Sequence, residues 1–376
     1  MKRSYFILPL LLAVLIGFAS CTNEPEMPDY YEKIAEAHRP KDVFGGVYIL
    51  NQGASGKNQA SLDFICFEKG YYIHDIYGAR NPNVVKELGD VGNDLHIYGS
   101  KLFAVLNTSN KVEVININGT RRIQQIDIPN CRYVASYNGN VYVSSYGIAE
   151  SGKVPLGKVY RIDTASLQIT GEVEVGYQPE QMVVRNGLLY VANSGGYMAP
   201  HYDNTVSVVD LSSFTEMKKI PVAINLERML LDESNNIWVT SRGDYNEIHS
   251  SLYIIDASDN VSKLDIPCTN MVRYKHYIYY IASEWINGKL SKISYGVIDT
   301  NTKEKISDSF IPAEYVAKIK MPYGLTVHPV TGDIYIADAD NFQVQGKLYT
   351  FSQDGKLLWE VKTGFLPACF AFRPKK

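Results

Sequence analysis

Aromatic and charged side chains recur in glycine-rich segments that follow short apolar runs. The aromatic residues are Tyr146, Tyr197, Tyr202, Tyr245, Trp285 and Phe342, and the polar residues beside them are Arg242, Asp244, Glu284, Asp340 and Asn341. Aromatic rings in exposed glycine-rich loops are not explained by a core. They offer flat apolar faces for stacking on a sugar or a planar ligand, while amides and charges fix its orientation. The pattern predicts ligand contacts; for any single residue, surface decoration is the alternative.

The sequence lacks the arrangements that covalent chemistry needs. It contains neither HExxH nor G-x-S-x-G. Residues 53–57 (GASGK) lack the spacing of a phosphate loop, and residues 338–341 (DADN) lack the later Gly and Glu of a calcium loop. We therefore expect no enzyme, no cofactor and no metal. A propeller lyase or hydrolase with Glu180 and Glu227 as acid and base is the less favoured alternative.

Six similar segments predict the elements that position these residues. Each begins with a turn and alternates over two short strands, and a third and a fourth alternating strand follow. The first core residues of the segments are Leu95, Val134, Met182, Met229, Val272 and Leu325, at spacings of 39, 48, 47, 43 and 53 residues. Four short strands every ~45 residues are typical of a β-propeller blade.

A seventh blade is split between the two ends of the chain. Residues 46–51, 60–67 and 71–76 supply three strands, and residues 367–372 (PACFAF) repeat the start of a blade and supply the innermost one. Pairing of the terminal strands closes the ring and removes exposed sheet edges. The prediction is an all-β, seven-bladed β-propeller over residues 45–376.

The connections between strands two and three are long and varied, whereas the turns between strands one and two are short. The long connections are 51–59, 145–157, 194–204, 242–250, 284–292 and 338–346. In a propeller these connections share one face with the links between blades. Insertions collected on one face are typical of a binding face, the alternative being loops that bind nothing.

A second ring is predicted at the mouth of the central channel. It consists of the two residues before each first core residue: Asn93/Asp94, Arg132/Tyr133, Glu180/Gln181, Glu227/Arg228, Asn270/Met271, Tyr323/Gly324 and Ala368/Cys369. We expect Asp94, Arg132, Tyr133, Glu180, Gln181 and Arg228 to contact the ligand. Alternatively, Arg132, Glu227 and Arg228 are structural ion pairs.

The N-terminus is interpreted as an export signal. Lys2 and Arg3 precede an apolar run over 6–18, too short for a membrane span, which ends at Cys21. The segment resembles a bacterial lipobox, which implies a signal peptide over 1–20, lipidation of Cys21 and a flexible tether over 21–44; the alternative is an ordinary signal peptide and an incidental cysteine. The other cysteines, Cys66, Cys131, Cys268 and Cys369, have no CxxC spacing and are predicted to be free thiols. A net charge of −3 gives no basic surface for nucleic acid.

The blade motifs resemble a known family. The pattern G-x-L-Y-V-x-N followed by V-x-V-I-D is similar to YVTN/YncE-type propellers, and YQPEQMVVRNGLLYVANSGGY and SRGDYNEI resemble Bacteroidetes surface-lipoprotein propellers of the DUF5074 type. That family resembles the cobalamin-capturing lipoprotein BtuG. The resemblance implies a lipid-anchored, surface-exposed outer-membrane protein that captures a nutrient, with a cobalamin-type corrinoid as leading ligand, for a TonB-dependent transporter. A glycan- or protein-docking module is the alternative, since one fold serves many functions.

Overall fold

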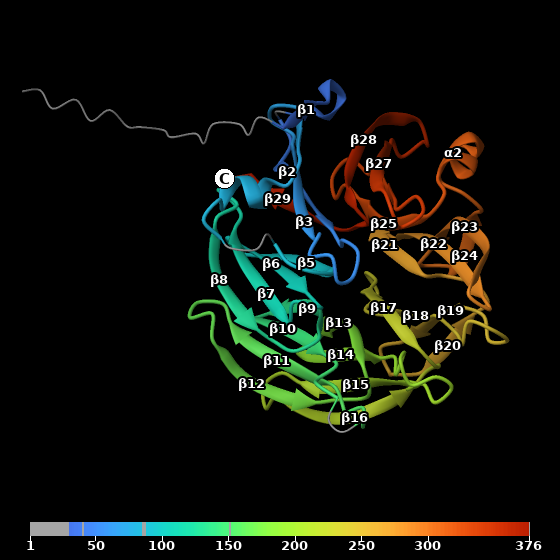
Figure 1. Ribbon diagram of the computed structural model, residues 1–376. Helices are drawn as coiled ribbons and strands as arrows, with labels where there is room; N and C mark the ends of the chain where they lie inside the picture. The colour runs from blue at the N-terminus through green and yellow to red at the C-terminus, as the bar shows by residue number, and fades with distance from the viewer. Residues whose placement is uncertain (1–29, 40, 85–87, 150–151, 376) are drawn as a thin grey trace, which may run out of the picture.

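The computed structural model describes residues 30–39, 41–84, 88–149 and 152–375, which form a closed ring of seven antiparallel blades (Figure 1). Blades 1 to 3 are continuous in the chain. Blade 1 is β5 (Gly92–Tyr98), β6 (Lys101–Leu106), β7 (Lys111–Asn116) and β8 (Arg122–Asp127). Blade 2 is β9 (Cys131–Tyr137), β10 (Asn140–Ser145), β11 (Lys158–Asp163) and β12 (Ile169–Glu174). Blade 3 is β13 (Pro179–Arg185), β14 (Leu188–Asn193), β15 (Thr205–Asp210) and β16 (Thr215–Pro221).

Blades 4 to 6 repeat this order. Blade 4 is β17 (Leu226–Leu231), β18 (Ile237–Ser241), β19 (Ser251–Ile255) and β20 (Val261–Leu264). Blade 5 is β21 (Asn270–Tyr274), β22 (Tyr277–Ile286), β23 (Lys289–Asp299) and β24 (Glu304–Ser307). Blade 6 is β25 (Pro322–Val327), β26 (Ile334–Asp338), β27 (Gln345–Phe351) and β28 (Leu357–Phe365). The first core residues predicted from the repeat lie on these innermost strands, which confirms the six complete blades.

Blade 7 joins the two ends of the chain. Its innermost strand is β29 (Pro367–Pro374), followed outward by β2 (Phe44–Asn51), β3 (Ser61–Cys66), β4 (Tyr71–Ile73) and β1 (Tyr31–Lys33). Val47 pairs with Phe372 and Ile49 with Phe370, so blue β2 lies beside red β29 in Figure 1. The predicted closure is confirmed, and with it the seven-bladed propeller.

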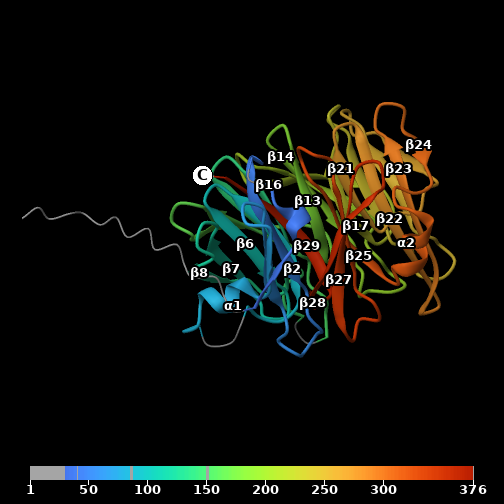
Figure 2. The ribbon, with the colours of Figure 1, turned by 90° about the horizontal axis from the view of Figure 1, so that it is seen from above.

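The core lies between neighbouring blades. The second strand of a blade has both faces covered, so β6 and β14 are continuous apolar runs with almost every residue buried. The fourth strand forms the rim, and in β8 exposed residues alternate with half-buried or buried ones. The strands run from one face of the ring to the other (Figure 2), and the mouth is formed where the innermost strands begin.

Three local features depart from the sequence prediction. The strand predicted over 71–76 ends at Ile73, because the Asp75 side chain accepts a hydrogen bond from the Gly78 amide and begins helix α1 (Ile76–Arg80). A second helix, α2 (Ala313–Lys318), accounts for the wide spacing before blade 6. Its Tyr315 ring packs 5.1 Å from the ring of Phe351.

Residues 30–44 were predicted as part of a flexible tether, and their described part instead packs on the propeller. Strand β1 pairs with β4, and the short 3-10 helix η1 (Ala35–Ala37) buries Ala37 beside the buried Ile34. Arg39 then pairs with Asp333, and Asp42 lies 3.1 Å from the buried His328 ring. The predicted signal peptide and Cys21 lie outside the described residues. No helix within the described ranges is long and apolar enough to cross a membrane.

Candidate functional site

A cavity of about 550 Å³ opens at the centre of the face that carries the strand two-to-three connections. Every blade contributes to its lining, through the starts of innermost strands and through these connections. Arg132 and Tyr133 come from blade 2, Arg228 and Arg242 from blade 4, and Trp285 from blade 5. The two predicted sets of residues, loop aromatics and mouth residues, therefore meet in one place.

One side of the mouth is a charged wall, which we define as Arg132, Glu180, Glu227, Arg228 and Arg242 on blades 2 to 4. Glu180 is fully buried and lies 2.9 Å from an Arg132 guanidinium nitrogen and 3.3 Å from one of Arg242. The Tyr146 hydroxyl donates a further hydrogen bond to it. Arg242 also donates from Nε to Glu227 at 2.7 Å. Two carboxylates and two guanidinium groups thus form one connected network.

A repeated Ser-x-Gly motif positions two members of this network. Ser145-Tyr146-Gly147 ends β10 and Ser241-Arg242-Gly243 ends β18. In each, the serine hydroxyl donates to a carbonyl of the preceding inter-blade link and accepts from the glycine amide two residues on. The glycines have φ of +74° and +67°, which glycine adopts without strain. The strand stops there, and Tyr146 and Arg242 both turn toward Glu180.

The network fixes the charge states of its members. Burial opposes ionisation of Glu227, but the guanidinium groups of Arg242 and Arg228 outweigh burial and lower its pKa to about 2. Burial also works against the charged form of Arg242, and Glu227 and Glu180 outweigh it and raise the arginine pKa. Glu227 is therefore a fixed anion rather than a group able to exchange a proton near neutral pH.

The other side of the mouth is an aromatic wall, which we define as Trp285, Tyr323 and Phe342 on blades 5 and 6. The ring centroids of Trp285 and Phe342 lie 6.4 Å apart, and those of Phe342 and Tyr323 lie 6.0 Å apart in an edge-on arrangement. Met321, Ala339 and Leu366 are buried beneath them. The Tyr323 hydroxyl donates to Gln52 at 2.5 Å, which ties the wall to blade 7.

Trp285 is carried by a β-hairpin, although 284–292 was predicted as a loop. β22 continues to Ile286 and β23 resumes at Lys289, so only Asn287 and Gly288 form the turn. Both have positive φ, 50° and 72°, as in the two-residue hairpin turns that Asn-Gly favours. Blades 2 and 4 have a Ser-x-Gly motif at the end of the second strand, and blade 5 has Ser283-Glu284-Trp285 at the same place. Because the glycine is missing, β22 continues through this position.

The cavity brings together nine of the sixteen residues predicted to contact a ligand. They are Arg132, Tyr133, Tyr197, Arg228, Arg242, Tyr245, Glu284, Trp285 and Phe342. Tyr197 is 77% exposed, and its ring meets that of Tyr146 edge-on at 5.7 Å. The other seven do not line the cavity: Asp94, Tyr146, Glu180, Gln181, Asp244, Asp340 and Asn341.

Asp94 and Gln181 join neighbouring blades instead. The Asp94 carboxylate accepts from the Val134 amide of the next blade, and the Gln181 amide oxygen accepts from the Met229 amide, both at 2.9 Å. Asn93 and Asn270, the first residues of their pairs, line the cavity as predicted and also donate to carbonyls of the following blade. The prediction that both residues of each pair edge the opening is therefore only partly right, because Asp94, Gln181 and the buried Glu180 do not line the cavity.

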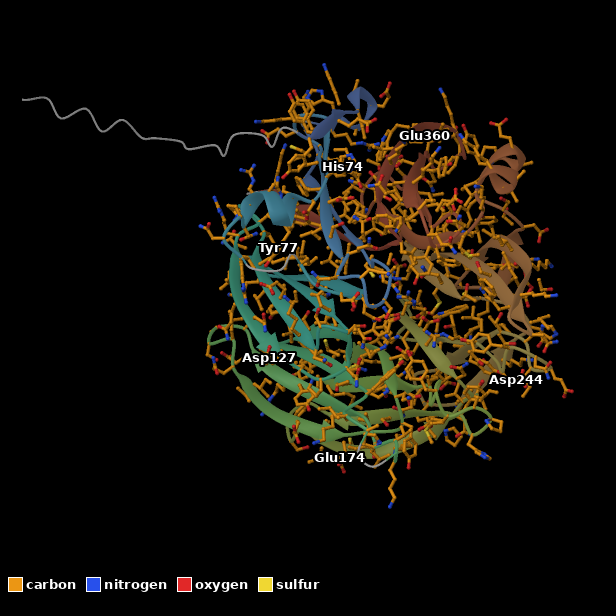
Figure 3. The ribbon with its side chains drawn as sticks, viewed as in Figure 1. His74, Tyr77, Asp127, Glu174, Asp244 and Glu360 are labelled. Carbon is orange, nitrogen blue, oxygen red and sulfur yellow. The ribbon has the colours of Figure 1, made fainter. Side chains whose placement is uncertain are left out.

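The remaining residues have local structural roles. The Asp244 carboxylate accepts from the Asn246 and Ile248 amides and lies toward the outside of the ring (Figure 3). Asp340 pairs with Lys320 at 2.8 Å, and the Asn341 side-chain oxygen accepts from the Gln343 amide. Tyr146 and Glu180 are buried in the charged network beneath the surface.

Sequence reasoning missed several small polar residues of the cavity. They are Gln52, Ser55, Asn107, Thr108, Asn246, Ser250, Thr269 and Ser283. Asn107 and Thr108 lie in the short strand two-to-three turn of blade 1, which a search for long connections passes over. The signal that was available is position: apart from Ser283, which lies within β22, each of these residues follows the end of a second strand or precedes an innermost one. His249 also lines the cavity, 3.6 Å from Glu284.

Two motif-like segments have structural explanations. The Gly56 amide donates to Asp90 at 2.7 Å, so a carboxylate occupies the place a phosphate would need. Asp338 accepts from the amides of Met321 and Asp340 at 2.9 Å. The described ranges contain no group of three metal-ligating side chains. The four described cysteines are free thiols as predicted, and burial raises the pKa of Cys131 and Cys369 to about 12.

A family model described as a domain of unknown function, DUF5074, matches residues 45–373, nearly the whole propeller. The chain belongs to the DUF5074 family. A search of curated proteins finds no match to this DUF5074 protein.

Solved structures share its fold. A quinonprotein alcohol dehydrogenase-like protein from Bacteroides thetaiotaomicron superposes with a TM-score of 0.62 at 15% identity, covering 88% of this chain and 78% of that one. A functionally unknown protein from Desulfotomaculum acetoxidans superposes with a TM-score of 0.61 at 10% identity, covering 88% of this chain and 100% of that one. Kuenenia stuttgartiensis hydrazine synthase superposes with a TM-score of 0.55 at 15% identity, covering 74% of this chain and 88% of that one. At these identities the likeness establishes the propeller fold alone.

Proposed function

We propose that this protein is a lipid-anchored surface binding protein that captures a nutrient in the mouth cavity, with a cobalamin-type corrinoid as leading ligand, for transfer to a TonB-dependent outer-membrane transporter. The observation that carries the binding role is the cavity between the charged and the aromatic walls. Its volume, about 550 Å³, lies within the range of small-molecule sites. A stacking surface opposite fixed charges suits a flat ligand with polar substituents.

The corrinoid is chosen because it combines a broad, largely flat ring with many hydrogen-bonding substituents, and because the blade motifs resemble cobalamin-capturing lipoproteins. A ligand of that size extends beyond the cavity. Side chains at its rim then provide further contact, among them Tyr197 and Ile248, which are 77% and 52% exposed. A small ligand uses only the cavity, whereas a corrinoid reaches these exposed tips as well.

The state of the carboxylates favours binding over acid–base catalysis. Glu180 and Glu227, the pair considered as acid and base, are both held by arginines. With its pKa lowered to about 2, chiefly by Arg242 acting against burial, Glu227 has no proton to donate near neutral pH. Capture by stacking and hydrogen bonding needs no such proton.

The direct test is titration calorimetry of the purified protein with cyanocobalamin. We expect one-to-one binding that Trp285→Ala weakens by roughly ten- to a hundredfold, the usual effect of losing an aromatic anchor. Arg273→Gln is the matched control, because Arg273 is paired with Glu233 on the opposite face. No heat at micromolar protein, or equal affinity in Trp285→Ala, would contradict corrinoid capture in the mouth and favour glycan or protein docking.

The anchor is tested separately. Metabolic labelling with palmitate should mark the wild-type protein and not Cys21→Ser, and protease added to whole cells should degrade the propeller if it faces outward. Labelling that persists in Cys21→Ser, or a propeller protected in intact cells but not in lysed ones, would contradict the surface lipoprotein proposal.

A further inference from the structure

The charged wall contains three guanidinium groups and only two carboxylates. Arg132 and Arg242 bind Glu180 and Glu227 at hydrogen-bond distance. Arg228 does not: its Nε lies 3.8 Å from the nearest Glu227 oxygen, too far for a hydrogen bond. The Arg228 side chain is 20% exposed, and its Nε is buried without a hydrogen-bond partner among the described residues.

The described neighbours of Arg228 do not accept hydrogen bonds from its guanidinium group. Its guanidinium carbon lies 5.3 Å from the centroid of the Tyr133 ring, a cation–π contact that leaves the N–H donors open. Asp94 is the other carboxylate close enough to act on its charge, but the two Asp94 oxygens accept backbone hydrogen bonds from Leu95 and Val134. A half-buried guanidinium with open donors costs stability, and a ligand oxyanion removes that cost.

Arg228 also adjoins the aromatic wall. Tyr323 lies close enough for the Arg228 charge to act on its hydroxyl, and its ring contacts that of Phe342, which in turn lies beside Trp285. A ligand that places an anionic group on Arg228 therefore has a stacking surface within the same cavity. Guanidinium groups bind carboxylates and phosphates through two parallel N–H donors, which suits this position.

We infer that Arg228 is the anion-binding subsite of the mouth, and that it selects ligands in which a carboxylate or a phosphate ester is attached to a flat ring. This rests on the proposed binding role of the cavity and specifies the chemistry of its ligand. Arg132 and Arg242 are positioning residues of the wall, whereas Arg228 contacts the ligand itself.

The test uses phenyl phosphate and benzoate as probes, with benzyl alcohol as the neutral probe, in ligand-detected NMR titrations of the full chain. We expect wild type to bind at least one anionic probe more tightly than benzyl alcohol, and the better of the two identifies phosphate ester or carboxylate. Arg228→Gln should weaken that binding on the order of tenfold or more. It should leave benzyl alcohol unchanged, and Arg273→Gln should behave as wild type.

Thermal unfolding separates this role from a structural one. Arg228→Gln removes a guanidinium group that hydrogen-bonds no carboxylate and has only the 3.8 Å contact with Glu227, so its unfolding temperature should stay close to that of wild type. Arg242→Gln breaks two closer ion pairs and should unfold well below wild type. Equal affinity of Arg228→Gln and wild type for the anionic probes, or no preference of wild type for them, overturns the subsite. An unfolding temperature of Arg228→Gln as low as that of Arg242→Gln also overturns the subsite, because it would show that Arg228 has a structural role. Because corrinoid capture is measured separately by calorimetry, a failed corrinoid titration leaves this result standing, and the reverse also holds.

Discussion

The two walls of the mouth are built in opposite ways. The charged wall is held by the ends of strands in three consecutive blades, and its members bind one another: Glu180 is fully buried among Arg132, Arg242 and Tyr146. The aromatic wall stands on the Trp285 hairpin, the turn that carries Phe342 and the start of β25, and its three rings all face the cavity. The comparison shows that residues of the same predicted class can have different roles. Most of the charges maintain the shape of the site, and the rings remain available to a ligand.

Removal of Glu180 should have the largest effect, because it breaks the charged wall at its centre. Glu180→Gln leaves the guanidinium groups of Arg132 and Arg242 buried without their shared anion. We expect the free energy of unfolding to fall by about 3–5 kcal/mol in urea denaturation, as when one partner of a buried ion pair is removed. Glu233→Gln, whose carboxylate is 58% exposed and paired with Arg273, should change it by less than about 1 kcal/mol. Equal effects of the two changes would show that the network is not structural.

Acid should weaken the charged wall and leave the aromatic wall intact. The pKa of Glu227 is lowered from 4.5 to about 2 as Arg242 and Arg228 outweigh the effect of burial. Its contribution is therefore present above the unfolded-state pKa and is lost as the pH falls toward the folded-state value. It amounts to about 3 kcal/mol at most, because a tenfold change in proton affinity corresponds to about 1.36 kcal/mol.

Unfolding free energies measured from pH 6 to pH 2 should fall more steeply in wild type than in Glu227→Gln. Glu233→Gln, with its exposed carboxylate, should follow the wild-type slope. Parallel curves for wild type and Glu227→Gln would show that the Glu227 carboxylate keeps an ordinary affinity for protons in the folded protein.

A smaller change tests the aromatic wall through its effect on ligand affinity rather than on stability. Gly288→Ala at the tip of the Trp285 hairpin forces a side chain into positive φ, at a cost of about 1 kcal/mol. Gly139 in the β9–β10 turn has a similar φ, +80° against +72°, and an added Cβ meets no atom within 4 Å at either glycine. Gly139→Ala, on the opposite face, should therefore cost similar stability and leave affinity unchanged.

In calorimetry, Gly288→Ala should lower affinity for cyanocobalamin several-fold. Equal affinities of Gly288→Ala and Gly139→Ala for cyanocobalamin would show that the hairpin does not contribute to binding.

The sequence predicted the blades well because each strand class carries its own local pattern. The doubly covered β6 and β14 are continuous apolar runs, and the Asn-Gly and Gly-containing turns recur at fixed places. The charged wall was harder to predict, since Glu180 meets Arg132 and Arg242, residues 48 and 62 positions away on neighbouring blades. No local pattern shows that these two arginines hydrogen-bond carboxylates and that Arg228 does not. The Asn287-Gly288 turn, by contrast, was a local signal that segment length obscured.

The most direct test of the mouth as the ligand site is hydrogen exchange measured by mass spectrometry, with and without cyanocobalamin. Binding between the two walls should slow exchange in the hairpin around Trp285, in β17 beside Arg228 and in the segment around Phe342. The opposite-face turns at Asn138–Gly139 and Asn186–Gly187 should be unaffected. Protection confined to the opposite face or to the rim strands, with no change at the hairpin or β17, would contradict the account.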